Sequence, residues 1–307
     1  YARPTLLQAV GDRREAPEFL PEPACPFYDA AQFPGHYATG SNSPYGEAFT
    51  ALAAMTRRDP RLCDDGAALA AAWLAFTRAY TGRHDGAMKA VAKNMEEGRT
   101  AFPDMGADDN QAHCFFKAAV AVAADAGSAA LDRARLNTLI RFHQNNEMAW
   151  LCGLFYAELL HAVKNGGAVP DACTAARAVL DAEPESEAKS QIVQALDFEA
   201  AHRDTDTYTM LASLNVAIGK SESVEAAMAA PFIYTTSCVN PGALARLVHV
   251  LHRATSFEDG VRVNLLVGGD NASTALGIGA VLGVVYGVPP AWESQYKADA
   301  NFLASLE

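Results

Sequence analysis

The chain has 307 residues, half of them hydrophobic, which excludes an intrinsically disordered protein and is enough for a large buried core. Its formal net charge is −12, so binding of nucleic acid through a basic surface is excluded. Alanine is abundant and β-branched runs are few, a composition that favours helices. The composition therefore indicates a folded, acidic, helix-rich protein.

The cysteines are scattered along the chain and none forms a Cys-x-x-Cys pair. The six are Cys25, Cys63, Cys114, Cys152, Cys173 and Cys238. Most lie within apolar stretches of helical periodicity, which predicts buried free thiols and a reducing compartment. Because the sequence starts at Tyr1 without a methionine, we also expect N-terminal processing or residues upstream.

The first 46 residues are rich in proline and lack periodicity, so they predict an extended segment anchored on the body by its aromatic side chains. A helix is expected to follow Pro44 and to run through Met55, with Glu47 in its first turn, where the helix dipole stabilises an acid. We expect one helical domain over 47–292 and a C-terminal tail over 293–307.

Several acids precede the helices that we expect next. Asp64 and Asp65 are interpreted as capping acids for a helix over 67–80, which a further helix over 87–98 follows. Asp108, Asp109 and Asn110 precede an apolar helix over 114–124. Because three oxygen-bearing side chains exceed what capping requires, we predict that they line a pocket. His113 is expected to be a packed or surface histidine.

The polar turn 143–146 precedes the most strongly amphipathic stretch, 148–163. Two interpretations have equal weight: Asn145 or Asn146 caps this helix, or the turn borders a pocket. We expect further helices over 172–180, 187–201, 223–230 and 258–266, and a polar loop over 204–207. Another helix should begin with Pro241 at its first position and bury Leu244, Leu247, Val248 and Leu251.

The stretch from Gly268 to Gly287 organises the chain. Gly268 and Gly269 allow a tight turn, and Asp270 is placed to cap the helix behind them. That helix is apolar on every side, which predicts that it is buried, with one face left bare by glycines at 279, 283 and 287. The uncharged run 271–292 is not a membrane span, because glycines and Pro289–Pro290 interrupt it and no Lys or Arg flanks it.

Gly-Gly-Asp before a glycine-rich buried helix resembles the C-terminal signature of the ADP-ribosylglycohydrolase superfamily, whose enzymes carry Gly-Gly-Asp-Thr-Asp-Thr. The resemblance follows element order over nearly the whole chain and implies a compact, single-domain, all-α fold. Tyr45-Gly46-Glu47-Ala48 aligns with the family's Thr-Asp-Asp-Thr. Tyr-Gly-Glu here, and Asn-Ala after Gly-Gly-Asp, are most similar to the jellyfish J-type crystallin branch.

The resemblance also implies a site for two magnesium or manganese ions and an ADP-ribose-like ligand. The implied metal ligands are Glu47, Asp270 and Ser273. The implied ligand-binding residues are Asp108, Asp109, Asn110, Asn145, Gly268 and Gly269. Gly46 and Ala272 stand where the family's enzymes carry carboxylates, which predicts one weak cation site or none.

Two functions follow from the resemblance. The first is a member with lost or altered activity that serves as a structural or assembly subunit with protein partners. The second is an active, metal-dependent hydrolase of ADP-ribosyl or related glycosidic bonds. Catalytic residues are not assigned by either hypothesis.

Overall fold

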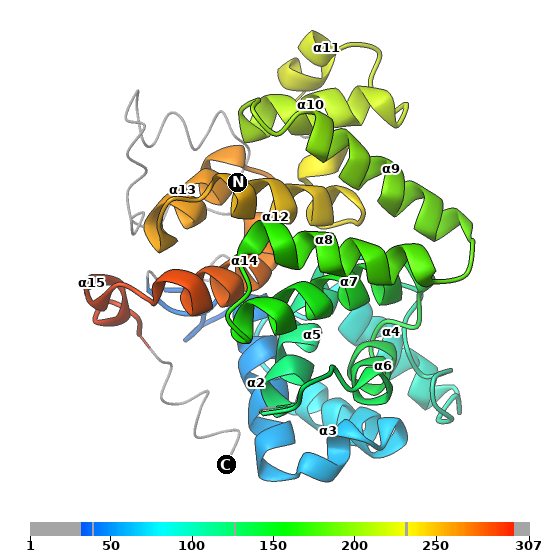
Figure 1. Cartoon of the computed structure of the whole chain (residues 1–307). Helices are drawn as coiled ribbons and strands as arrows, with labels where there is room; N and C mark the ends of the chain where they lie inside the picture. Colours follow the sequence, from blue (N-terminus) through cyan, green and yellow to red (C-terminus); the bar gives the residue numbers. More distant parts are fainter. Residues whose placement is uncertain (1–31, 39, 126, 231–232, 298–307) are drawn as a thin grey trace. The chain divides into compact units, whose positions relative to one another are not determined.

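The computed structural model describes residues 32–38, 40–125, 127–230 and 233–297. These residues form helices and connecting turns without any β-strand, so the all-α prediction is confirmed (Figure 1). None of the described helices has the length and apolar character required to cross a membrane. The N-terminal segment up to residue 31 and most of the predicted tail lie outside the described residues.

The chain divides into two compact units. The described part of the first, here called the α2 unit, comprises residues 32–38, 40–125, 127–157 and 290–297. The described part of the second, the α12 unit, lies within Glu158–Pro289. The expected boundaries of the helical domain stay a prediction.

The α2 unit is built around α5, a helix whose residues from His113 to Val122 are all buried. Helix α5 packs against α2 and α6. The elements of this unit are α2 (Pro44–Arg58), η1 (Pro60–Cys63), α3 (Gly66–Ala79), α4 (Gly86–Glu96), α5 (His113–Ala124), α6 (Arg133–Arg141), the first part of α7 (Glu147–Lys164) and α15 (Pro290–Glu293). Trp73 on α3 is a large, fully buried side chain beside Phe142.

Acidic caps determine where helices of the α2 unit begin. Asp65 accepts hydrogen bonds from the backbone nitrogens of Ala67 and Ala68, which confirms its predicted capping role. Asp132 caps α6 in the same way. Helix α6 was not expected from the sequence. It contains three arginines, and its apolar face consists only of Leu136, Leu139 and Ile140, which is too short to give a clear helical periodicity.

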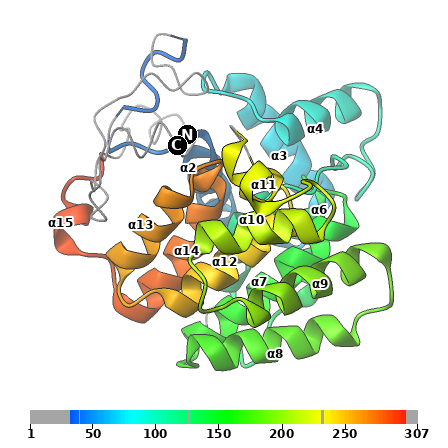
Figure 2. The same ribbon diagram turned by 90° about the horizontal axis from the view of Figure 1, so that it is seen from above.

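The α12 unit surrounds α12, which packs against α8, α9, α10, α13 and α14 (Figure 2). Its predicted buried face is confirmed, since Leu244, Leu247, Val248 and Leu251 are all buried. The elements are α8 (Val169–Ala182), α9 (Glu187–Ala201), α10 (Thr207–Ala217), α11 (Val224–Ala229), η2 (Tyr234–Thr236), α12 (Gly242–Arg253), α13 (Phe257–Val267) and α14 (Asn271–Tyr286).

Two boundaries in this unit differ from the sequence-based expectation. The stretch predicted as a polar loop over 204–207 contains a helix start, because Asp206 caps α10 by accepting from the Thr209 nitrogen at 3.1 Å. Pro241 occupies the cap position of α12 and not its first helical position. Helix α10 (Thr207–Ala217) was not among the expected helices, so the first difference is a missed helix, whereas the second is a shift of one residue.

Helix α14 is buried on one side only, so the prediction of burial on every side is wrong. Ile278, Val281 and Leu282 are fully buried, whereas Val284 is 47% and Val285 is 40% exposed. Its neighbours in the unit are α12 and α13, and a 16-residue helix has more surface than these two cover. The sequence of a helix shows that its side chains are apolar. It does not show how much of the helix surface the neighbouring helices cover.

The described cysteines form no disulfide with one another. Cys63, Cys114, Cys152 and Cys173 are buried and Cys238 is partly buried. Cys25 lies outside the described residues. The prediction of buried thiols is therefore confirmed for four positions.

Candidate functional site

Glu47 lies in the first turn of α2, and its side chain is only 2% exposed. Its Oε1 is 2.8 Å from Nδ1 of His36, and its Oε2 accepts a hydrogen bond from the Tyr80 hydroxyl. The His36 ring is fixed in turn, since its Nε2 is 3.0 Å from Oγ1 of Thr81. Both carboxylate oxygens of Glu47 are therefore occupied by partners within the α2 unit.

Two tyrosines complete the surroundings of Glu47. The hydroxyls of Tyr37 and Tyr80 are 3.0 Å apart. Burial, followed by the hydrogen bond to Glu47, raises the pKa of Tyr80 well above its usual range, and burial raises the pKa of Tyr37 to about 12. Both phenols thus keep their protons at neutral pH, so Tyr80 remains a donor to the carboxylate.

The acidic loop before α5 binds the turn that precedes α7. Asp109 Oδ1 accepts from the Gln111 nitrogen at 2.9 Å and from Gln144 Nε2 at 2.7 Å. Asp108 Oδ1 accepts from Asn146 Nδ2 at 2.6 Å. The cap position of α5 is Ala112, which has no side-chain capping bond. Asp108 and Asp109 therefore hold two loops together and do not cap α5.

A buried lysine lies behind this loop. Lys117 is fully buried and donates from Nζ to Gln144 Oε1 at 2.7 Å. The Gln144 amide nitrogen also donates to the carbonyl oxygens of Asp109 (3.1 Å) and Gln111 (2.9 Å). Burial lowers the pKa of Lys117 to about 7, against a smaller opposing effect of the Asp109 charge.

Lys117 and Gln144 were not identified from the sequence. The sequence does contain a sign that Lys117 is buried, because it is the only Lys, Arg, Asp or Glu in the apolar stretch 113–124. His113 is also buried and packs on Tyr45, with ring centroids 4.8 Å apart, which confirms the packed interpretation. Burial, and then the charge of Lys117, lowers the pKa of the neighbouring His143 well below its usual value.

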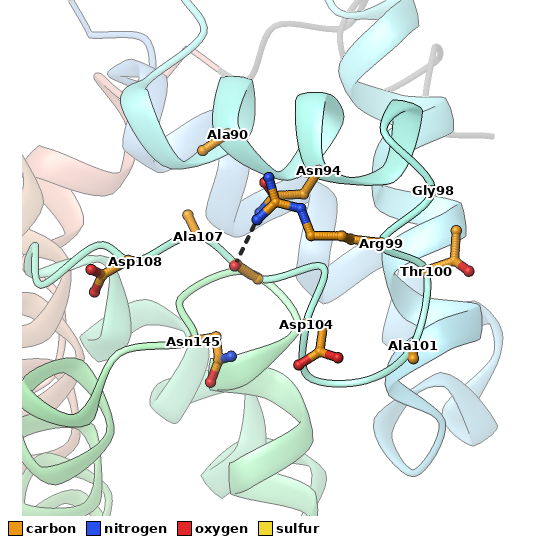
Figure 3. Close-up of a pocket in the computed structure, with 11 residues that line it drawn as sticks. Ala90, Asn94, Gly98, Arg99, Thr100, Ala101, Asp104, Ala107, Asp108 and Asn145 are labelled. Atoms are coloured by element: carbon orange, nitrogen blue, oxygen red, sulfur yellow. Dashed lines mark hydrogen bonds between the residues drawn. The ribbon is translucent and has the colours of Figure 1, made fainter.

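A cavity of about 690 Å³ lies beside the acidic loop, between α4 and the turn before α7. Figure 3 shows Asp104, Asp108 and Asn145 around it. The other lining residues are Ala90, Asn94, Gly98, Arg99, Thr100, Ala101, Gly106 and Ala107. Two predicted ligand-binding residues, Asp108 and Asn145, are thus brought together, whereas Asp109 and Asn110 are not among the lining residues.

The capping interpretation of the 143–146 turn is confirmed for Asn146, and the ligand-binding interpretation stays a prediction. Asn146 Oδ1 accepts from the Ala149 nitrogen at 3.1 Å in the first turn of α7. Asn145 borders the cavity and accepts from Arg141 Nη1 at 3.0 Å.

In the α12 unit, Asp270 caps α14 as predicted, by accepting from the Ser273 nitrogen at 3.2 Å. The Asp270 nitrogen donates to Thr236 O at 3.0 Å. Fully buried Arg246 donates to Asp270 O at 3.0 Å and also to Thr236 O. Burial lowers the pKa of Arg246 to about 10. Arg246 thus joins the start of α14 to the η2 turn.

The backbone conformation before Asp270 requires glycine at positions 268 and 269. Gly268 and Gly269 have φ values of 75° and 68°, where side chains are disfavoured. A Cβ at Gly269 would lie 2.1 Å from Thr236 O. Ser273 is 1% exposed, and its hydroxyl has no hydrogen-bond partner among the described residues.

The side chains present do not fit a pair of divalent cations. Both carboxylate oxygens of Glu47 already have protein partners, His36 and Tyr80. Gly46 and Ala272 offer no side-chain donor. In the part of the chain that the structure describes, no three His, Cys, Asp or Glu residues are grouped so that they could hold a metal.

Comparison with known proteins gives the family. A family model described as ADP-ribosylglycohydrolase matches residues 12–305, so the chain belongs to the ADP-ribosylglycohydrolase family. A solved structure titled "ADP-ribosylglycohydrolase-related protein complex" is similar, with a TM-score of 0.60 and 17% identity over 99% of this chain and 94% of that one. At this identity the likeness shows the fold alone.

No curated protein matches significantly. The jellyfish crystallin-like branch therefore stays a prediction.

The buried ammonium of Lys117 predicts a pH-dependent stability. Its pKa is about 7 in the folded protein, whereas an unfolded lysine titrates near about 10.4. Between these values the unfolded chain binds the proton and the folded chain does not, so stability increases as pH rises from 7. Urea unfolding of the wild type and of Lys117→Met, from pH 6 to 9, should give a steeper rise for the wild type.

Lys93→Met is the matched control, because the Lys93 side chain is 74% exposed. Its stability curve should run parallel to that of the wild type. Parallel curves for the wild type and Lys117→Met would contradict the prediction.

Proposed function

We propose that this chain is a non-hydrolytic member of the ADP-ribosylglycohydrolase family, with a degenerate metal site, that acts as a structural or assembly subunit. The observation that carries the proposal is the state of Glu47, whose two oxygens bind His36 and Tyr80. The Glu47 carboxylate stabilises the start of α2, and neither of its oxygens is left for a cation.

Chemistry supports the same conclusion. Hydrolysis by a pair of magnesium or manganese ions requires oxygen ligands that hold both ions and activate a water. Hydrogen bonds to charged groups contribute about 1.5–3 kcal/mol each, so releasing Glu47 from both partners would cost several kcal/mol. It would also take the charged acceptor away from the buried Tyr80 hydroxyl, whose other neighbour is the Tyr37 hydroxyl. Gly46 and Ala272 provide no replacement ligand.

The active-hydrolase alternative has one observation in its favour. The Ser273 hydroxyl is buried without a described partner, in the first turn of the helix that Asp270 caps. In this alternative, Asp270 and Ser273 would hold a single magnesium or manganese ion. Ligand binding does not require the metal, and we propose that the cavity beside Asp108 and Asn145 accepts an ADP-ribose-like ligand.

The cavity volume of about 690 Å³ supports this ligand proposal, since small-molecule sites span roughly 300–1,000 Å³. Asp109 and Asn110 would support it from the same loop, and Gly268 and Gly269 are retained as proposed ligand-binding residues of the α12 unit. The free thiols favour a reducing compartment.

Calorimetry with Mg²⁺ and with Mn²⁺ tests the loss of metal chemistry. The wild type and Asp270→Ala should both give no binding heat, because neither presents a complete ligand set. An ADP-ribosyl hydrolysis assay with each metal should give no turnover. Micromolar binding that disappears in Asp270→Ala, together with turnover, would establish the hydrolase instead.

An apolar surface supports the assembly role. Val284, Val285 and Tyr286 at the end of α14 are 47%, 40% and 48% exposed, and Val288 beyond it is 50% exposed. The similar solved structure carries the word "complex" in its title. We take the occupant of this surface to be a second copy of the chain, since clustered exposed apolar side chains are typical of protein interfaces.

Light scattering should therefore give a mass above the 32.6 kDa of one chain for the wild type. Val284→Asp with Val285→Asp should return the protein to the single-chain mass, because a buried charge opposes association. Met228→Asp is the control, since Met228 is 42% exposed on α11. A monomeric wild type would contradict the proposed self-assembly.

A further inference from the structure

A second cavity, here called the α2–α5 groove, lies within the α2 unit and has a volume of about 660 Å³. Its walls come from α2, η1, α5 and the start of α6. Ala53 and Ala54 on α2 oppose Ala119 and Ala123 on α5. Their methyl side chains are too short to fill the space between the helices, which leaves the groove open.

Most of the groove surface is apolar. Phe49 lines it together with Val120, and the Phe49 ring lies 6.2 Å from that of Phe116. Cys63 forms part of the wall, and burial raises the pKa of its thiol, so the sulfur stays protonated and behaves as an apolar group. An apolar body of drug-like size is therefore the chemistry that this surface accepts.

The polar groups in the groove are satisfied within the protein, with one exception. The hydroxyls of Thr50 and Thr56 donate to their own helix, to Gly46 O and Leu52 O, each at 2.9 Å. The Arg135 guanidinium donates to Asp125 at 2.6 Å and to Asp64 at 3.3 Å. The threonine hydroxyl protons are thus already donated, and two carboxylates already balance the charge of Arg135.

The exception is Arg57, an exposed residue that lines the groove from the last turn of α2. No hydrogen bond or ion pair joins its side chain to another described residue. A guanidinium presents parallel donors that match a carboxylate. Such an arginine beside an apolar groove favours an anion that also has an apolar body.

We propose that the α2–α5 groove binds a small amphipathic anion, with its apolar chain between α2 and α5 and its carboxylate on Arg57. A monocarboxylate with a medium-length aliphatic chain has this chemistry. The site uses no residue of the acidic loop or of the α14 start, so it is independent of the proposed function.

Dodecanoate is the probe, and its binding to the full chain is measured by calorimetry below its micellar concentration. The wild type should bind dodecanoate and should bind dodecylammonium at least about tenfold more weakly, since only the carboxylate pairs with Arg57. Arg57→Leu should weaken dodecanoate binding about tenfold. Arg58→Leu is the matched control, because Arg58 is the next exposed residue of α2 and does not line the groove.

Ala123→Trp tests the location of the apolar chain. Ala123 is an exposed lining residue, so an indole there can enter the groove without disturbing the core. This variant should abolish dodecanoate binding while its circular dichroism spectrum and melting temperature remain those of the wild type.

Three results would overturn the proposal: no binding of dodecanoate to the wild type, equal binding of dodecylammonium, or equal effects of Arg57→Leu and Arg58→Leu. Unchanged binding by a folded Ala123→Trp would also overturn it.

Discussion

A buried charged side chain requires hydrogen-bond partners within the protein. This constraint determines which atoms contact Glu47. Glu47 meets it with His36 and Tyr80, which lie 11 and 33 residues away along the chain. Removing His36 or Tyr80 would leave one oxygen of a buried carboxylate without its hydrogen bond, at a cost of about 1–3 kcal/mol. The same contacts that stabilise the start of α2 therefore compete with any cation for the carboxylate.

Two buried basic side chains, Lys117 and Arg246, also have partners in loops. Lys117 binds Gln144, and through it the acidic loop that carries Asp109. Arg246 joins Thr236 to the backbone of Asp270. In both places these hydrogen bonds hold a loop beside the positions where the family resemblance implies ligand binding. The protein thus retains ordered loops although two of the implied carboxylates are replaced by Gly46 and Ala272.

The sequence predicts what is local in this structure. Asp65 and Asp270 were identified as caps because capping depends on residues two or three positions apart. The pairing of Lys117 with Gln144 spans 27 residues, and the sequence contains no rule that joins them. The exposure of Val284 likewise depends on how far α12 and α13 reach, which periodicity does not encode. The family resemblance predicted the position of the acidic loop. It did not predict that His36 and Tyr80 bind the Glu47 carboxylate.

Anomalous diffraction from crystals grown with Mn²⁺ is the most direct test of the central claim that Glu47 is committed to protein partners. The account predicts no manganese peak at Glu47, with His36 Nδ1 and the Tyr80 hydroxyl still at hydrogen-bond distance from its carboxylate. A manganese peak bonded to the Glu47 carboxylate, with His36 or Tyr80 displaced, would contradict it.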